Sequence, residues 1–339
     1  MNNNRRFTLN TNQNIIVEFT DERIIPAGGL AVVGALLGKS DFVKKLNRMD
    51  ITKNRSQHQI KNGDIILTYI GMLCMGKPYF EAVHEMDDDK AFYQAALGIT
   101  RSIPSEETLR QRMDEIGDSL RKTILNENIE LLISNKIQPT ALSNGFVPVD
   151  IDVTTPRDGK TVYVGSDWKE VCSKQFEKEF TLRAGYEITE RTMDKYGQIF
   201  LIPEIEVETW WTNLGATDEE IIQLYHAHGE CEQFHSEIKT DMDLERLPSG
   251  KFATNALVLE LGLIAYNILR MIGQGTIGDR APRQKRDVKR RRVHTVISNL
   301  VMMASHVTTH ARQLVMGLGK SNVWRHLFAD YCESSIAVS

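Results

Sequence analysis

Apolar residues in the first 140 positions recur at intervals of three and four, the spacing that places them on one face of an α-helix. Four segments show this pattern most clearly: residues 64–75, 79–86, 90–97 and 109–132. Ser105 stands before the acidic pair Glu106-Glu107, so it should cap the last of these helices. The pattern therefore predicts a helical N-terminal domain over residues 1–140.

Apolar and polar residues alternate from residue 147 onward, which indicates a β-strand with one face buried. In this strand Ile151 and Val153 alternate with Asp150 and Asp152. Further strand-like runs cover residues 161–164, 181–189 and 198–212. The middle of the chain is thus predicted to be rich in β-structure.

Helical spacing returns at Thr217, which forms a capping-box pattern with Glu220. The helix that begins there should continue to about Asp243. A second helix over residues 255–272 is apolar on most sides and should be buried. A third helical pattern covers residues 293–318. Together these elements indicate the α+β class.

Composition places the chain among globular proteins of about two domains. It has 339 residues, of which 41% are hydrophobic and 25% are charged. The longest apolar stretch, residues 256–272, contains Glu260 and Arg270, so we expect no membrane span and a cytoplasmic protein. The four cysteines form no CxxC pair, which argues against a disulfide framework and a zinc ribbon.

Two groups of basic residues are candidates for DNA contact. The net charge is −4, yet seven of the ten residues from 283 to 292 are basic, among them Arg290, Arg291 and Arg292. The alternative for this cluster is a solvated helix face or loop. The helix after Ser105 carries Arg110 and Arg112, which suit the second helix of a helix-turn-helix; a surface helix of a bundle explains them equally well.

The segment from Tyr225 to Lys239 has the most informative pattern. At the spacing of an α-helix, Tyr225, His228, Glu232 and Lys239 fall within an arc of roughly 60°, so one face would present a phenol, an imidazole, a carboxylate and an ammonium. Two other interpretations stay open. One is an amphipathic helix with an exposed charged stripe. The other is a zinc site built from His228, Cys231 and His235.

The spacing Tyr225-x2-His228-x3-Glu232-x6-Lys239 resembles the Tyr-x2-Arg-x3-Glu-x6-Lys signature of DDE-type bacterial insertion-sequence transposases, in the branch that carries histidine. The strand with Asp152 is similar to the family's first catalytic strand, which has an Asp-x-Thr pattern. Residues 210–214 resemble the end of the strand that leads into the glutamate helix, and residues 103–112 resemble the family's N-terminal DNA-binding region. The resemblance covers nearly the whole chain.

This resemblance implies a ribonuclease H-like fold and a protein that cleaves transposon ends and transfers strands by two-metal chemistry. Asp152 and Glu232 would be catalytic and would bind Mg²⁺ or Mn²⁺. Tyr225, His228 and Lys239 would contact phosphates of the DNA end. The implied partner is double-stranded DNA of the transposon terminal repeats, in the bacterial cytoplasm near the nucleoid.

The family's second aspartate is missing from this sequence. After Thr155 the chain passes directly into residues that already resemble the family's β-rich insertion, so we infer an internal deletion near Thr155. Asp158 and Asp167 are the nearest substitutes, but both stand in turn-like contexts. The expected fold is a helical N-terminal domain and a truncated ribonuclease H-like domain over residues 145–275. That domain would contain a β insertion at about 156–200, and a basic C-terminal helical region would follow over residues 276–339.

Three hypotheses about function follow. In the first, the chain is a transposase by descent whose cleavage is impaired, because two acids replace three. In the second, it is a non-catalytic DNA-binding remnant or an inhibitor that occupies transposon ends or pairs with full-length transposase. A homodimer is a further expected partnership of the chain. In the third, it is a helical module stabilised by zinc.

Overall fold

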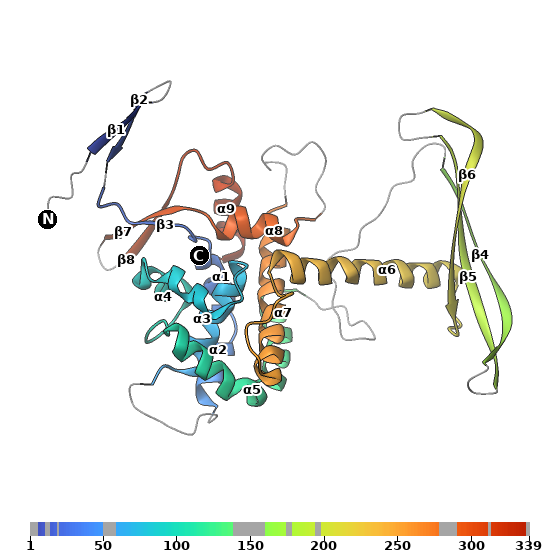
Figure 1. The fold of residues 1–339 in the computed structure, drawn as a ribbon, viewed down its shortest axis with the longest axis horizontal. Helices are drawn as coiled ribbons and strands as arrows, with labels where there is room; N and C mark the ends of the chain where they lie inside the picture. The colour runs from blue at the N-terminus through green and yellow to red at the C-terminus, as the bar shows by residue number, and fades with distance from the viewer. Residues whose placement is uncertain are drawn as a thin grey trace. The chain divides into compact units, whose positions relative to one another are not determined.

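The computed structural model describes residues 6–10, 14–18, 20–49, 59–137, 160–173, 178–193, 198–277, 290–310 and 313–336. The chain forms two compact units (Figure 1). The first combines residues 1–149 with residues 237–339, and the second comprises residues 150–236. The predicted strand at residues 147–153, the inferred seam near Thr155 and the first predicted domain boundary all lie outside the described residues.

Helices make up most of the first unit. In its N-terminal part they are α1 (Leu30–Gly38), α2 (Phe42–Arg48), α3 (Asn62–Cys74), the 3-10 helix η1 (Phe80–Met86), α4 (Lys90–Leu97) and α5 (Glu106–Ser134). In its C-terminal part they are the π-helical turn η2 (Glu237–Asp241), α7 (Phe252–Gly275), α8 (Val293–Val296), the π-helical turn η3 (Ile297–Val301), α9 (Arg325–Tyr331) and the π-helical turn η4 (Cys332–Ile336).

Helix α7 lies at the centre of the first unit, beside α3 and α5 (Figure 1). Leu257, Leu261 and Ile264 are buried at the three-to-four spacing of its inner face. Gly117 of α5 allows the two helices to approach closely, since a side chain there would meet the backbone of Ala253. Among the described helices, α7 alone is long and apolar enough to cross a membrane, but 72% of its apolar window is buried inside the protein. It is the core helix of this unit.

Hydrogen bonds fix the start of α5 and the loop before it, and they confirm the predicted cap. The Ser105 hydroxyl accepts from the backbone N–H of Thr108, as expected of an N-cap. The preceding loop is held by Asp64, a fully buried carboxylate that accepts from the N–H groups of Thr100 at 2.9 Å and Arg101 at 3.1 Å. These hydrogen bonds compensate the Asp64 carboxylate for the water that it loses on burial.

The first unit contains strands at positions where the sequence pattern predicted a helix or no element. The chain begins with the hairpin β1 (Arg6–Asn10) and β2 (Asn14–Glu18), which the sequence pattern did not reveal. The helix predicted over residues 293–318 is wrong beyond Val301, because β7 (Ser305–His310) and β8 (Gln313–Leu318) form a hairpin that pairs with β3 (Ile24–Ile25). Ser305 and Val307 are buried while the residues between and after them are exposed, which is the period of a strand.

The second unit contains a three-stranded antiparallel sheet and one helix. The sheet has the order β4 (Lys160–Ser173), β5 (Lys178–Met193) and β6 (Ile199–Thr212), so the predicted β-rich middle of the chain is confirmed. Helix α6 (Asp218–Ser236) packs against β5 at Gly185, where Ile221 lies 3.4 Å from the position a Cβ would take. The predicted capping box is also confirmed, with Thr217 and Glu220 exchanging hydrogen bonds of 2.9 and 3.3 Å.

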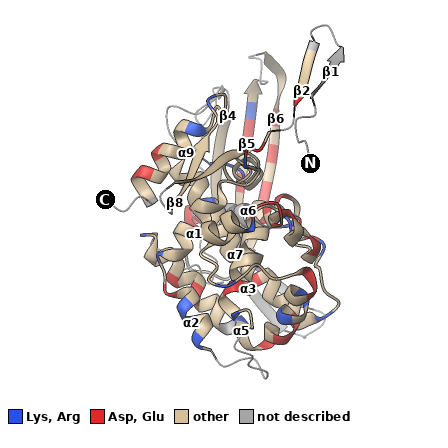
Figure 2. Ribbon diagram, turned by 90° about the vertical axis from the view of Figure 1, so that its left-hand side faces the viewer, with Lys and Arg blue, Asp and Glu red and all other residues tan. Residues whose placement is uncertain are grey.

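Strand β6 is an edge strand of this sheet and is exposed along most of its length. Leu201 is fully exposed and Ile202 is 79% exposed. Figure 2 shows acidic segments along β6, where Glu204, Glu206 and Glu208 occupy alternate positions. Overall the described residues form a mixed α+β fold, as predicted.

We expect the variant Leu261→Ala to lower the free energy of unfolding of the first unit by about 2–5 kcal/mol, because it opens a cavity in the fully buried face of α7. The matched control is Leu259→Ala in the same helix, where the side chain is 42% exposed. Urea unfolding followed by circular dichroism measures both. Equal losses in the two variants would contradict the central position of Leu261.

Candidate functional site

Tyr225 is held against strand β6 by two contacts within the second unit. Its ring stacks on Trp210 with centroids 5.7 Å apart and an interplanar angle of 27°. Its hydroxyl donates a 2.7 Å hydrogen bond to the carbonyl oxygen of Trp211. The single phenolic proton is therefore used inside the protein, and a phosphate could receive it only if this bond were broken.

Glu232 lies on the same helix, two turns after Tyr225. Its side chain is exposed and makes no hydrogen bond or ion pair with any residue that the structure describes. His228 is also part of α6, but its side chain lies outside the described residues, as does the whole of Asp152. The predicted meeting of Asp152 and Glu232 stays a prediction.

Metal ligands are sparse in the described part of the chain. No group of three or more His, Cys, Asp or Glu side chains there could hold an ion. Glu232 offers one carboxylate, whereas a two-metal site needs several oxygen ligands. For the zinc alternative, the side chains of His228 and Cys231 lie outside the described residues.

The π-helical turn η2 follows α6 directly and carries Lys239. Its defining bond runs from the N–H of Met242 to the carbonyl of Glu237, five residues earlier, at 3.2 Å. The predicted 60° arc assumed α-helical spacing through residue 239, whereas the described backbone is π-helical from Glu237 to Asp241. The Lys239 side chain is exposed, and its ammonium has no partner among the described residues.

Arg290 is bound to a buried carboxylate of this turn. It donates to both oxygens of Glu237, at 2.8 and 2.7 Å, and the side chain of Glu237 is 1% exposed. The Tyr266 hydroxyl completes the group with a 3.2 Å bond to the same carboxylate. Burial opposes the charge on Arg290, but the hydrogen bond and the attraction of Glu237 prevail and raise its pKa.

Arg291 and Arg292 also have partners inside the first unit. Arg291 is buried, donates to the Thr276 carbonyl at 2.8 Å and lies over the Trp324 ring at 5.0 Å; burial lowers its pKa. Arg292 is more exposed and donates to Asp241 at 2.8 and 2.9 Å, and this hydrogen bond raises its pKa. Residues 283–289 of the predicted basic cluster lie outside the described residues.

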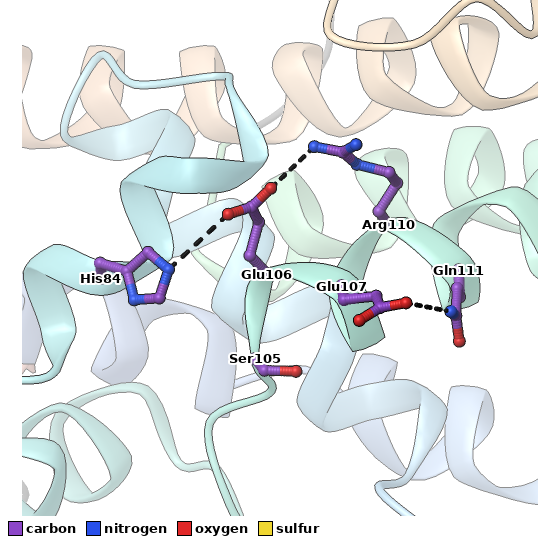
Figure 3. Close-up of a pocket in the computed structure, with 6 residues that line it drawn as sticks. All are labelled: His84, Ser105, Glu106, Glu107, Arg110 and Gln111. Carbon is purple, nitrogen blue, oxygen red and sulfur yellow. Dashed lines mark hydrogen bonds and ion pairs between the residues drawn. The ribbon is translucent and has the colours of Figure 1, made fainter.

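The two arginines predicted on α5 are similarly engaged. Arg110 donates to Glu106 at 2.8 Å and to Glu81 at 3.2 Å, and Arg112 is buried with Glu115 and Asn62 as partners. Figure 3 shows Arg110 on one side of Glu106 and His84 on the other, in a pocket that Ser105, Glu107 and Gln111 complete. The carboxylates of this pocket neutralise its cations, so its surface does not favour a phosphate.

Comparisons with known proteins place this arrangement in context. The family model described as "Transposase DDE domain" matches residues 108–268, and the one described as "Transposase DDE domain group 1" matches residues 201–336. These matches support a DDE-type transposase. The search of curated proteins and the search of solved structures find no match.

The two transposase matches overlap over residues 201–268, the stretch that contains β6, α6 and η2. They therefore support a general role in DNA transposition, and the family generally uses divalent metal ions. Sequence reasoning missed Glu237 and Asp241 of this stretch. No local signal marks these acids, because their partners Arg290 and Arg292 lie 53 and 51 residues later in the chain.

We expect His84 to titrate above its ordinary pKa of 6.5, because it hydrogen-bonds Asp87 at 2.9 Å and also lies near Glu106. Because its pKa is raised in the folded state, protonated His84 stabilises the folded protein. This contribution is fully present below pH 6.5 and is lost as the pH rises through the folded-state pKa. NMR titration of the imidazole measures the pKa, and Asp87→Asn should lower it. An unchanged value in that variant would show that Asp87 is not the cause.

Proposed function

We propose that the chain is a transposase by descent that binds double-stranded DNA of transposon terminal repeats and is impaired in cleavage. The observation that carries this proposal is the overlap of two transposase family matches on the segment with Tyr225, Glu232 and Lys239. The signature spacing of these residues supports the histidine-carrying branch of insertion-sequence transposases. An inhibitor that occupies DNA ends is the related alternative, and it differs only in lacking all cleavage.

The impairment follows from the number of acids. Glu232 is exposed and without a protein partner in the described part of the chain, so it is available as a ligand, and Asp152 would be the second. When bound, Mg²⁺ or Mn²⁺ would activate the attacking oxygen and stabilise the leaving one. Two carboxylates hold such ions less firmly than three, so we expect weak cleavage at most.

An internal deletion near Thr155 would account for the small sheet of the second unit, whose three described strands pair only with one another. Every strand pairing among the described residues is antiparallel, in sheets of two or three strands. This is consistent with a ribonuclease H-like domain over residues 145–275 that has lost its central strands. We propose that a helical N-terminal domain over residues 1–140 precedes this domain and that a basic region over residues 276–339 follows it. We also propose that the protein acts in the bacterial cytoplasm near the nucleoid.

Lys239 is our leading candidate for phosphate contact, and His228, another residue of the signature, is the second candidate. The guanidinium groups of Arg110, Arg112 and Arg291 already have partners inside the protein. Tyr225 is better explained as the side chain that fastens α6 to β6. Within the described part of the chain, few of the predicted cations are therefore available for DNA contact.

We expect Lys239→Gln to weaken binding of a DNA duplex and to reduce the slope of log K against log salt by about one unit, as loss of one phosphate contact requires. The probe is a duplex selected by the purified full chain from a random-sequence library, and fluorescence anisotropy is measured between 50 and 200 mM salt. Lys320→Gln, another exposed lysine, is the control and should leave the slope unchanged. An unchanged slope for Lys239→Gln would remove this residue from the interface.

Nicking of the same duplex in 5 mM Mg²⁺ or Mn²⁺ should be weak or undetectable, on the order of 10²-fold or more below a three-acid enzyme. Any residual nicking should disappear in Glu232→Gln and persist in Glu219→Gln, which alters an exposed glutamate of the same helix. Robust nicking by the unaltered chain that Glu232→Gln abolishes would show an intact catalytic core and contradict the deletion.

A further inference from the structure

Two carboxylates on η2 bind two arginines that follow each other closely in the chain. Glu237 accepts two hydrogen bonds from Arg290, and Asp241 accepts three from Arg292. We call these four residues the arginine clasp. The arginines come from the segment that leads into α8, so the clasp fastens η2 to a part of the chain about 50 residues away.

Each half of the clasp has a further hydrogen bond that fixes its geometry. Tyr266 of the core helix α7 donates to Glu237 at 3.2 Å. Asp241 accepts from the backbone N–H of His294 at 3.1 Å, in the first turn of α8. The π-helical turn is thereby tied to both α7 and α8. A π-helical turn is rare, and such external bonds are what keep it in place of ordinary α-helix.

Lys239 lies midway between the two clasped acids. Without the arginines, Glu237 and Asp241 would place two negative charges within two residues of the lysine, where they would attract its ammonium and repel a phosphate. With the arginines bound, both acids are neutralised, and their side chains are 1% and 5% exposed. Lys239 remains exposed and without a partner among the described residues.

We propose that Arg290 and Arg292 are positioning residues that hold η2 and neutralise its acids so that Lys239 is presented to a DNA phosphate. This inference rests on the proposed function, and it assigns to the two arginines a role different from the phosphate contact that the basic cluster suggests. The two roles predict opposite effects for the same substitution, which makes them separable.

The decisive variant is Glu237→Gln, measured with the duplex and anisotropy assay described above. If Arg290 contacts phosphate directly, loss of its carboxylate partner frees it and raises DNA affinity. If Arg290 positions the turn, the same change loosens η2 and lowers affinity, and Arg290→Gln lowers it by a similar factor of about ten. A rise in affinity for Glu237→Gln overturns the inference.

A double-mutant cycle tests whether Arg290 acts through Lys239. In the Lys239→Gln background, Arg290→Gln should cause less than about a twofold further loss, because the contact it supports is already gone. Additive losses would mean an independent phosphate contact and would overturn the inference. The variant that combines Glu237→Gln with Arg290→Gln should bind better than Arg290→Gln alone, since it leaves no unpaired buried charge.

Two controls keep the result interpretable. Arg121→Gln removes an arginine that pairs with Glu260 at 3.2 Å in the same unit, and it should leave affinity unchanged. Circular dichroism confirms folding of each variant; should Arg290→Gln unfold, Arg292→Gln takes its place, because that side chain is 55% exposed. If the unaltered chain binds no selected duplex, both the proposed function and this inference are wrong. If the unaltered chain binds DNA and Glu237→Gln binds it more tightly, only this inference is wrong.

Discussion

The first unit depends on the burial of helix α7. This helix brings the N-terminal helices α3 and α5 into contact with the segment around α8, although these parts lie far apart in the sequence. Its apolar face supplies most of the driving force, since each fully buried leucine or isoleucine contributes about 1.5–3 kcal/mol. Polar contacts at its edges, such as Asn267 with Asn128 and Thr254 with Asp114, fix how α5 lies against it.

Burial of α7 also decides how the arginines of this unit are used. Arg270 is almost fully buried in α7 and donates to the backbone carbonyl of Arg291 at 2.9 Å. Arg290 and Arg291 lie near the same helix, and a guanidinium excluded from water must find acceptors within the protein. For Arg290, Arg291 and Arg292, the described part of the basic run, position in the sequence therefore does not indicate availability to DNA.

Local features of the fold could be predicted from the sequence, because they depend on neighbouring residues. The helices between Asn62 and Ser134, the three strands of the second unit and the caps at Ser105 and Thr217 are of this kind. The hairpin that contains Val307 was missed because its apolar residues also fit helical spacing, and its pairing of β7 with β8 and β3 is not visible in the local pattern.

The candidate site was less predictable, because its electrostatics depend on long-range pairs. The signature identified the helix that carries Glu232. No residue near Glu237 in the sequence indicates that its partner, Arg290, lies 53 residues later. The π-helical turn was equally hidden, since it depends on bonds to α7 and α8. Asp152 lies outside the described residues, so its place beside Glu232 still rests on the resemblance.

Strand β6 has a bearing on how this protein behaves in concentrated solution. An exposed edge strand with side chains such as Leu201 is a template to which a second molecule can add a strand. Pro203 removes one backbone donor from that edge, and the glutamates at 204, 206 and 208 would face like charges in many antiparallel registers. High salt that screens these charges would weaken the repulsion, so precipitation in concentrated salt would begin at this strand.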